Sequence, residues 1–355
     1  MWSIAEGSSI SNPEAVTLAL PPQHDRNASP SSSSAFSLVV AFVRMNVLTL
    51  DIHASSQRAP EGQQTGFNVT ARMGCFASRP SRHQVFACGV QEGRDTTDRE
   101  LIVGDYLVYT AARDERHQLG VQLWISQTVP CAHTDGSDLF VKAQHVVVLF
   151  RSPSIIVVSI TAAQFSATCC SAHAPTSAAE DSVIHQRWST LRSTILQFLK
   201  LSELFVLMID SNGRLGSNTS MSVGDVNHQV ENLNGSEMHD TFIALGVFAP
   251  STFQHDREGF KHTWESPDGT VRNRIDYVCF PLQTRPYVLH TFMIFDFYFG
   301  SVSRDHVWPA AVFDGRHQAN LTMASRRARP NRRLLNDPEA RDNFTQTLQE
   351  IQRPL

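Results

Sequence analysis

Several short apolar runs in this chain end directly in polar residues, and this pattern limits the folds that the chain can adopt. The clearest run is the continuous apolar segment 204–209, which leads into Asp210, Ser211 and Asn212. A short apolar run bounded by turn-forming residues is typical of a buried strand. The pattern predicts strands whose ends deliver polar side chains from a hydrophobic core.

The other expected elements follow from the same periodicities. Apolar residues at helical spacing predict a helix over residues 178–199, and residues 65–82, 237–245 and 338–351 are further helical candidates. Many strands with a few long helices between them indicate packed sheets flanked by helices. We expect strands at residues 37–43, 84–90, 101–110, 120–126, 145–150, 155–160, 271–280, 288–299 and 308–313.

Composition divides the 355 residues into three parts. Residues 1–35 are rich in Ser, Pro and Asn, so we expect a flexible leader that buries too little apolar surface to fold. Residues 36–316 are expected to form the folded domain. Residues 317–355 contain the arginine-rich segment 326–333 and are expected to form a connector and a C-terminal helix.

Charge and cysteine content restrict the class of protein. The formal net charge is −4, so no overall basic field indicates nucleic acid, although a local basic groove is compatible with this value. The six cysteines show no metal-like spacing, which favours buried free thiols. No apolar run reaches the ~18 residues that span a bilayer, and we see no secretory signal. We expect an intracellular protein, nuclear or cytoplasmic, with no membrane and no obligatory protein partner.

Two of the polar residues suit a hard metal ion. Asn46 and Glu92 each follow an expected strand, and Mg²⁺ prefers oxygen ligands, with one or two carboxylates and several waters. Either residue alone is more often part of a turn or a solvated edge. Together they are candidate metal ligands.

Further polar residues suit acid–base chemistry. Asp210 is a candidate to orient or deprotonate a water molecule, and Asn212 to hold a phosphate oxygen, although Asp-Ser-Asn-Gly is also a common turn sequence. His173 is expected in a loop. Asp276, in an apolar run, is costly to bury unless it holds an imidazole, which His306 can supply. Asp305 beside it is a candidate metal or water ligand.

These residues occur in an order that resembles the endonuclease/exonuclease/phosphatase superfamily, which includes DNase I-like nucleases. The resemblance covers about residues 37–315, and its segments around Asn46, Gln91 and Trp264 look most like LINE-type retrotransposon endonucleases. The arginine-rich tail is also similar to the connector of such proteins. The ordered set is Asn46, Gln91-Glu92, His173-Ala174-Pro175, Asp210-Ser211-Asn212, Arg274-Ile275-Asp276-Tyr277 and Asp305-His306.

The resemblance implies a fold and a set of roles. The fold is a four-layered α/β/β/α sandwich of two packed mixed sheets flanked by helices, with Mg²⁺ or Mn²⁺ as cofactor. The implied metal ligands are Asn46, Glu92 and Asp305. The implied substrate contacts are Arg94, Asn212 and Trp264, and the implied catalytic residues are His173, Asp210, Asn212, Asp276 and His306.

Three positions depart from parts of the superfamily. Leu48 stands where apurinic endonucleases place a second acidic residue, and His173 stands where they have tyrosine. The last motif, Ser-Arg-Asp-His-Val-Trp-Pro, has looser spacing than usual. These departures favour the DNase I and retroelement members over abasic-site enzymes.

Three functions remain open at this point. The first is a metal-dependent endonuclease that hydrolyses DNA phosphodiester bonds, a nicking module of the retrotransposon type that contacts the DNA phosphate backbone. The second is a phosphatase or phosphodiesterase acting on an inositol phosphate or a phospholipid headgroup. The third is an inactive fragment derived from a retroelement.

Overall fold

The computed structural model describes most of the expected domain. The described residues are 37–44, for the backbone alone, and 77–78, 80–93, 95–116, 119–134, 137–163, 165–199, 204–254, 261–266, 268–294 and 306–314. The expected leader at residues 1–35, the connector at 317–355 and the helix at 338–351 lie outside them.

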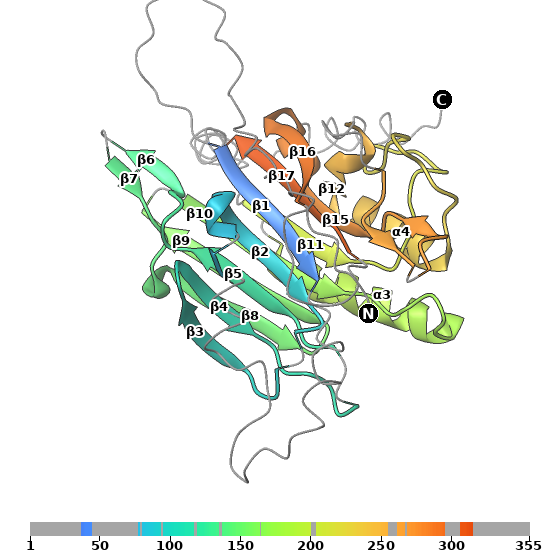
Figure 1. Cartoon of the computed structure of the whole chain (residues 1–355), viewed down its shortest axis with the longest axis horizontal. Helices are drawn as coiled ribbons and strands as arrows, with labels where there is room; N and C mark the ends of the chain where they lie inside the picture. The colour runs from blue at the N-terminus through green and yellow to red at the C-terminus, as the bar shows by residue number, and fades with distance from the viewer. Residues whose placement is uncertain are drawn as a thin grey trace, which may run out of the picture. The chain divides into compact units, whose positions relative to one another are not determined.

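The first main sheet has seven strands (Figure 1). Strand β1 runs parallel to β2 and antiparallel to β17, so the end of β2 and the start of β17 lie at the same end of this sheet. The order is β16 (Val288–Ile294), β17 (Trp308–Asp314), β1 (Ser37–Arg44), β2 (Val85–Gln91), β5 (Gln122–Ser126), β4 (Tyr106–Thr110) and β3 (Arg99–Val103).

The second main sheet has six strands. Like the first sheet, it has at its centre a strand with one parallel and one antiparallel neighbour. Strand β11 runs parallel to β10 and antiparallel to β15, which brings the ends of β10 and β11 beside the start of β15. The order is β12 (Val247–Phe248), β15 (Asp276–Pro281), β11 (Leu204–Asp210), β10 (Phe165–His173), β9 (Ile155–Ala162) and β8 (Val146–Ser152).

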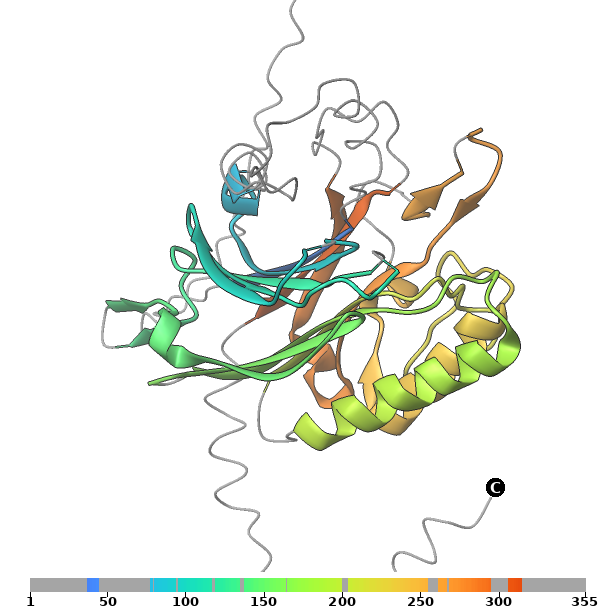
Figure 2. The same ribbon diagram turned by 90° about the horizontal axis from the view of Figure 1, so that it is seen from below.

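Helices cover the outer faces of the two stacked sheets. Figure 2 shows α3 (Asp181–Phe198) and α4 (Leu233–Leu245) side by side on the outer face of the second sheet. Residues 77–78 and 80–82 are helical, and Ala77 packs on the outer face of the first sheet. No helix in the described part of the chain is long and apolar enough to cross a membrane.

Three apolar clusters fill the spaces between these layers. They form because successive side chains of a strand point to opposite faces of its sheet. In β11, Val206 and Met208 face the first sheet, whereas Phe205 and Leu207 face α3 and α4. By the same alternation, Asp210 at the end of β11 faces the first sheet. Buried carboxylates at such positions need partners, which points to a site between the sheets.

The two sheets approach each other closely at Gly89, near the end of β2. A Cβ atom added to Gly89 of β2 would lie 2.7 Å from Met208 Cβ and 3.1 Å from Ser171 Oγ. The contact with Met208 is not possible without movement of the backbone, because a Cβ atom cannot swing aside. Glycine at position 89 therefore allows the observed spacing between β2 and the second sheet.

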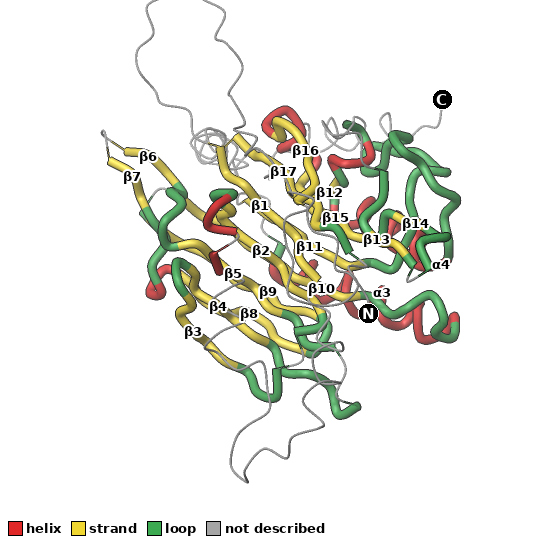
Figure 3. The backbone as a smooth tube through the Cα atoms, in the orientation of Figure 1, coloured by secondary structure: helices red, strands yellow, loops and turns green. Residues whose placement is uncertain are grey.

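The remaining described elements are short. Two-stranded ribbons are formed by β6 (Ala132–Thr134) with β7 (Ser137–Leu139) and by β13 (Trp264–Glu265) with β14 (Arg272–Asn273). Figure 3 labels the two strands of the second ribbon, β13 and β14. The 3-10 turns are η1 (Ala143–His145), η2 (Pro250–Thr252) and η3 (Leu282–Tyr287).

The predicted arrangement of two packed sheets with flanking helices is confirmed, with three local corrections. Residues 101–110 are not one strand, because the chain reverses at Gly104, whose φ is +55°, between β3 and β4. Residues 271–280 form the two strands β14 and β15. His173 was expected in a loop but is the last residue of β10, a strand that its Ser, Thr, Cys and Ala content did not reveal.

Candidate active site at the shared end of the two sheets

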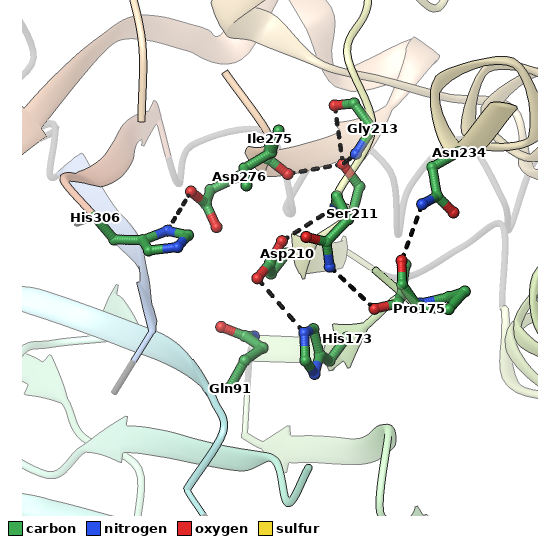
Figure 4. Close-up of polar contacts among 12 residues, drawn as sticks. Gln91, His173, Pro175, Asp210, Ser211, Gly213, Asn234, Ile275, Asp276 and His306 are labelled. Carbon is green, nitrogen blue, oxygen red and sulfur yellow. Dashed lines mark hydrogen bonds and ion pairs between the residues drawn. The ribbon is translucent and has the colours of Figure 1, made fainter. Parts of the chain in front are cut away.

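The register of the second sheet places three of the predicted catalytic residues next to one another. Asp210 is the Cα partner of His173 across β10 and β11, and of Asp276 across β11 and β15. All three are buried, and Figure 4 shows their side chains gathered in one group with Gln91 and His306. These five residues are called the strand-end cluster below.

One histidine–aspartate pair in the cluster is closely hydrogen-bonded. His306 Nδ1 lies 2.9 Å from Asp276 Oδ2, and the two residues are only 6% and 1% exposed. A carboxylate can only accept a hydrogen bond, so Nδ1 carries the proton and Nε2 is the ring nitrogen with the lone pair. His306 precedes β17 of the first sheet, so this pair joins the two sheets (Figure 4).

The second pair is looser and lies within one sheet. His173 Nε2 is 3.6 Å from Asp210 Oδ2, which is beyond hydrogen-bonding distance. The other carboxylate oxygen, Oδ1, accepts the backbone N–H of Asn212 at 3.1 Å. Asp210 is therefore oriented by the turn that follows its own strand, with its second oxygen turned toward the imidazole.

Two residues of the site have an unusual backbone conformation. Glu92, directly after β2, has φ +54°, and Asn212 has φ +47°. The left-handed region costs roughly 1–2 kcal/mol for residues other than glycine, although asparagine tolerates it better. Strain of this kind concentrates at functional sites, so the half-buried Glu92 is a strong candidate for a functional carboxylate.

The loop that carries Glu92 is held by buried hydrogen bonds. Gly93 N donates to Gly120 O at 2.8 Å. Gln122 Nε2 donates to Asp95 Oδ2 at 2.7 Å, and Gln122 Oε1 accepts from Trp124 Nε1 at 2.8 Å. Burial raises the pKa of Asp95, and the hydrogen bond from Gln122 opposes this shift. The loop is thus attached to β5 on both sides of position 94.

Two residues of the Arg274–Tyr277 motif have structural contacts. The Arg274 guanidinium donates to the carbonyl oxygens of Ser251, Val226 and Asn227 at 2.5–2.9 Å, and burial lowers its pKa. Tyr277 Oη donates to Arg274 O at 2.8 Å. This part of the motif holds loops in place, and Asp276 is its member in the strand-end cluster.

A pocket of about 530 Å³ lies beside the strand-end cluster. Asn212 and Ile275, the neighbours of Asp210 and Asp276, form part of its wall. Asn212 Nδ2 donates to Ala174 O at 3.1 Å, which leaves one N–H of this amide for another acceptor. The other polar and aromatic lining residues include Arg214, Asn232, Trp264 and Asn273.

A Ser–His–Glu chain near this pocket has a structural role. His239 Nε2 lies 2.8 Å from Ser220 Oγ, and His239 Nδ1 lies 3.1 Å from Glu231 Oε1. Ser220 Oγ also accepts the backbone N–H groups of Ser222 and Val223. Its lone pairs are therefore occupied, and the chain attaches the loop after β11 to α4.

The described residues are compatible with a bound Mg²⁺. No three of the described His, Cys, Asp and Glu side chains are grouped closely enough to hold a metal ion. Mg²⁺ nevertheless requires only one or two carboxylates together with waters, and the cluster offers oxygen donors beside Glu92. The predicted ligands Asn46 and Asp305 and the predicted substrate contact Arg94 lie outside the described residues.

Sequence analysis missed several residues that shape the site. Asn232 caps α4 by accepting Gly235 N–H at its side chain, and its Nδ2 donates to Asn212 O at 3.0 Å. An asparagine directly before a helical run is a recognisable capping signal. The Gln91 hydrogen bond to Ser171, at 2.8 Å, had no such signal because it joins different sheets.

Comparisons with known proteins bear on the fold. No family model matches the sequence, and no curated protein matches it. An AP endonuclease from Archaeoglobus fulgidus is 12% identical with a TM-score of 0.50, over 78% of this chain and 99% of that chain. The 3'-5' exonuclease NExo from Neisseria meningitidis is 15% identical with a TM-score of 0.51, over 78% of this chain and 100% of that chain.

Two further solved structures complete the comparison. A second NExo structure, described as a 3' phosphatase, is bound to a product DNA hairpin. The endonuclease domain of TRAS1, a telomere-specific non-LTR retrotransposon, is 11% identical with a TM-score of 0.43, over 78% of this chain and 98% of that chain. The Archaeoglobus fulgidus and Neisseria meningitidis structures show that the chain has their fold, the sandwich of the endonuclease/exonuclease/phosphatase superfamily.

Proposed function

We propose that the chain is a magnesium-dependent nuclease that hydrolyses DNA phosphodiester bonds and leaves a free 3′-hydroxyl. The observation that carries this proposal is the hydrogen bond between His306 and Asp276, buried at the same strand ends as Asp210 and His173. An imidazole held in one tautomer by a buried carboxylate is suited to proton transfer at neutral pH. The residues around it, which include His173 and Asn212, are suited to contact a phosphate group.

The first task of the site is to activate water. With Nδ1 bonded to Asp276, His306 presents Nε2 as the atom that takes or supplies a proton. Asp210, oriented by Asn212 N–H, is placed to align the attacking water. Hydrolysis forms a new P–O bond to this water and breaks the bond to the 3′ oxygen, which leaves with a proton.

The second task is to stabilise the charge on the phosphate. A bound Mg²⁺ supplies electrostatic stabilisation of the developing negative charge. Among the described residues, Glu92 is the proposed ligand. The His173 imidazole and the second N–H of the Asn212 amide are proposed to contact phosphate oxygens. Asn46 and Asp305 would complete the metal site, and Arg94 would contact the substrate.

The pocket beside Asn212 is the proposed place for the nucleotide next to the cleaved bond. Its volume of about 530 Å³ lies in the range of small-ligand sites. Trp264 supplies a ring on which a base can stack, and Arg214 supplies a positive charge. The retrotransposon type of nicking module remains the finer proposal, supported by the sequence resemblance around Asn46, Gln91 and Trp264.

A plasmid-nicking assay tests the function. We expect the wild type to convert supercoiled DNA to the nicked form with Mg²⁺ and to stop when EDTA removes the metal. Glu92→Gln and His306→Ala should each lose most of this activity, because the first weakens metal binding and the second removes the proton carrier. His185→Ala is the control, since His185 is exposed on α3 and pairs with Glu237 of α4, outside the strand-end cluster. Equal nicking by the wild type, Glu92→Gln and His306→Ala would contradict the proposal.

The second candidate is a phosphatase or phosphodiesterase on a small phosphate ester such as an inositol phosphate. The net charge of −4 favours it, because long-range repulsion disfavours DNA more than a small ester. Turnover of such an ester without DNA binding at low salt would replace the nuclease proposal with this one. An inactive retroelement fragment would show neither activity.

A further inference from the structure

Gln91 carries a buried polar atom that the fold does not satisfy. Its side chain is 0% exposed, and Nε2 donates to Ser171 Oγ of the opposite sheet at 2.8 Å. Its carbonyl oxygen Oε1 is buried and has no hydrogen-bond partner among the described residues. An unpaired buried acceptor destabilises a fold, so its presence requires an explanation.

A second buried glutamine in the same sheet shows that the fold can satisfy such a group. Gln122 of β5 is also 0% exposed and is the register partner of Val90 in β2. Both ends of its amide are bonded, Nε2 to Asp95 and Oε1 to Trp124. The open acceptor at Gln91 is therefore a local feature and not a general property of buried amides in this sheet.

The open acceptor borders the strand-end cluster. Figure 4 shows the amide end of Gln91 directed toward the space between His173, Asp210 and the Asp276–His306 pair. The next residue is Glu92, whose φ of +54° interrupts the alternation of side chains along β2. The residue with the open acceptor and the proposed metal ligand are thus adjacent in sequence at the end of β2.

The chemistry of magnesium explains what this acceptor can bind. Mg²⁺ retains several waters when it binds a protein, and these waters are polarised hydrogen-bond donors. Groups that accept hydrogen bonds around a metal orient its ligands and alter its affinity. A glutamine carbonyl accepts such a bond without adding negative charge beside Asp210 and Asp276.

We propose that Gln91 is a positioning residue of the metal site. Its Oε1 accepts a hydrogen bond from a water molecule in the hydration shell of the Mg²⁺ that Glu92 binds, while Ser171 holds its Nε2. This inference rests on the proposed function. It assigns to Gln91 a role in metal affinity that is separate from its contribution to the folded core.

The test compares Gln91→Met with Gln122→Met. Methionine is close in length to glutamine and has no strong acceptor. Thermal unfolding is measured with and without Mg²⁺, and the Mg²⁺ dissociation constant is measured by calorimetry. For Gln91→Met we expect a metal-free Tm within about 2 °C of the wild type, because removal of the unsatisfied Oε1 offsets the lost hydrogen bond from Nε2 to Ser171 Oγ. Its dissociation constant for Mg²⁺ should rise about tenfold or more.

Gln122→Met is the matched control for loss of a buried amide. It leaves Asp95 and Trp124 without their partner, so its metal-free Tm should fall by about 5 °C or more. Ser171→Ala is a second probe that retains the acceptor and frees the other end of the amide. It should raise the dissociation constant by only about two- to threefold, a smaller effect than for Gln91→Met.

The outcomes separate this inference from the proposed function. Wild-type Mg²⁺ affinity in Gln91→Met, with or without a lower Tm, would overturn the role of Gln91 and leave the nuclease proposal standing. A wild-type protein that binds no Mg²⁺ and nicks no DNA would overturn both. Weaker Mg²⁺ binding in Gln91→Met with an unchanged metal-free Tm would support the inference.

Discussion

The two histidine–aspartate pairs of the strand-end cluster differ in how the fold joins them. His173 and Asp210 are register partners in neighbouring strands of one sheet, and His173 Nε2 lies 3.6 Å from Asp210 Oδ2. His306 and Asp276 come from different sheets, yet they form a hydrogen bond of 2.9 Å. The first pair depends on strand register, whereas the second depends on how the sheets pack together.

From this difference we infer that the two pairs have different roles. A closely bonded pair fixes the tautomer of its imidazole and prepares it for proton transfer. A pair without a short hydrogen bond is less strictly oriented, so its groups can turn toward a water molecule or a phosphate oxygen. We therefore expect the pair that joins the two sheets to dominate the chemical step and the pair within one sheet to position the substrate.

The largest expected effect is at the pair that joins the two sheets. His306→Ala and Asp276→Asn should each reduce the nicking rate at saturating DNA by about 10³-fold, because the proton carrier is lost or held in the wrong tautomer. Single-turnover nicking measures this rate. A reduction below about tenfold in both variants would contradict the assignment, provided that thermal unfolding shows both to be folded.

A double-mutant cycle tests whether the two pairs differ in strength. For His306→Ala with Asp276→Asn we expect a coupling free energy of about 2 kcal/mol in the nicking rate, because the groups act as a unit. For His173→Ala with Asp210→Asn we expect about 0.5 kcal/mol, because no short hydrogen bond joins those atoms. Equal coupling in both cycles would remove the distinction.

The smallest expected effect is on the support of the pair within one sheet. Asn232→Ala removes the helix cap of α4 and the hydrogen bond to Asn212 O, so the free energy of unfolding should fall by about 1–2 kcal/mol. Nicking should fall only a few-fold, since Asp276 and His306 are untouched. Denaturant unfolding measures the stability change, with Asn218→Ala as a control for an exposed asparagine that bonds Glu231. A tenfold or greater loss of nicking would show that Asn232 does more than support the turn.

The polar ends of the strands were accessible to sequence analysis. The continuous apolar run before Asp210 indicates a core strand, and a buried aspartate such as Asp276 indicates a partner, which the structure identifies as His306. These inferences succeed because burial and local periodicity determine them. Strand β10 was not predicted because its Ser, Thr, Cys and Ala residues do not form a clear apolar run. His173 was therefore wrongly expected in a loop.

Contacts between distant segments could not be predicted. The open acceptor of Gln91 depends on which residue of the second sheet faces it, and no local pattern encodes that pairing. The guanidinium of Arg274 looked like part of a reactive motif, but its carbonyl acceptors come from the loop at Val226 and Asn227 and from the 3-10 turn at Ser251. Both sets of contacts can be identified only in the folded structure, where the distant segments are packed together.

The absent side chain at Gly89 has a consequence for how this protein tolerates mutation. The bond between His306 and Asp276 joins the two sheets and therefore depends on their separation, and even one methyl group at position 89 would push against Met208. A saturation screen should therefore score Gly89 as intolerant, although it touches no reacting atom. A residue without a side chain would then limit the proposed activity through the spacing of the two sheets alone.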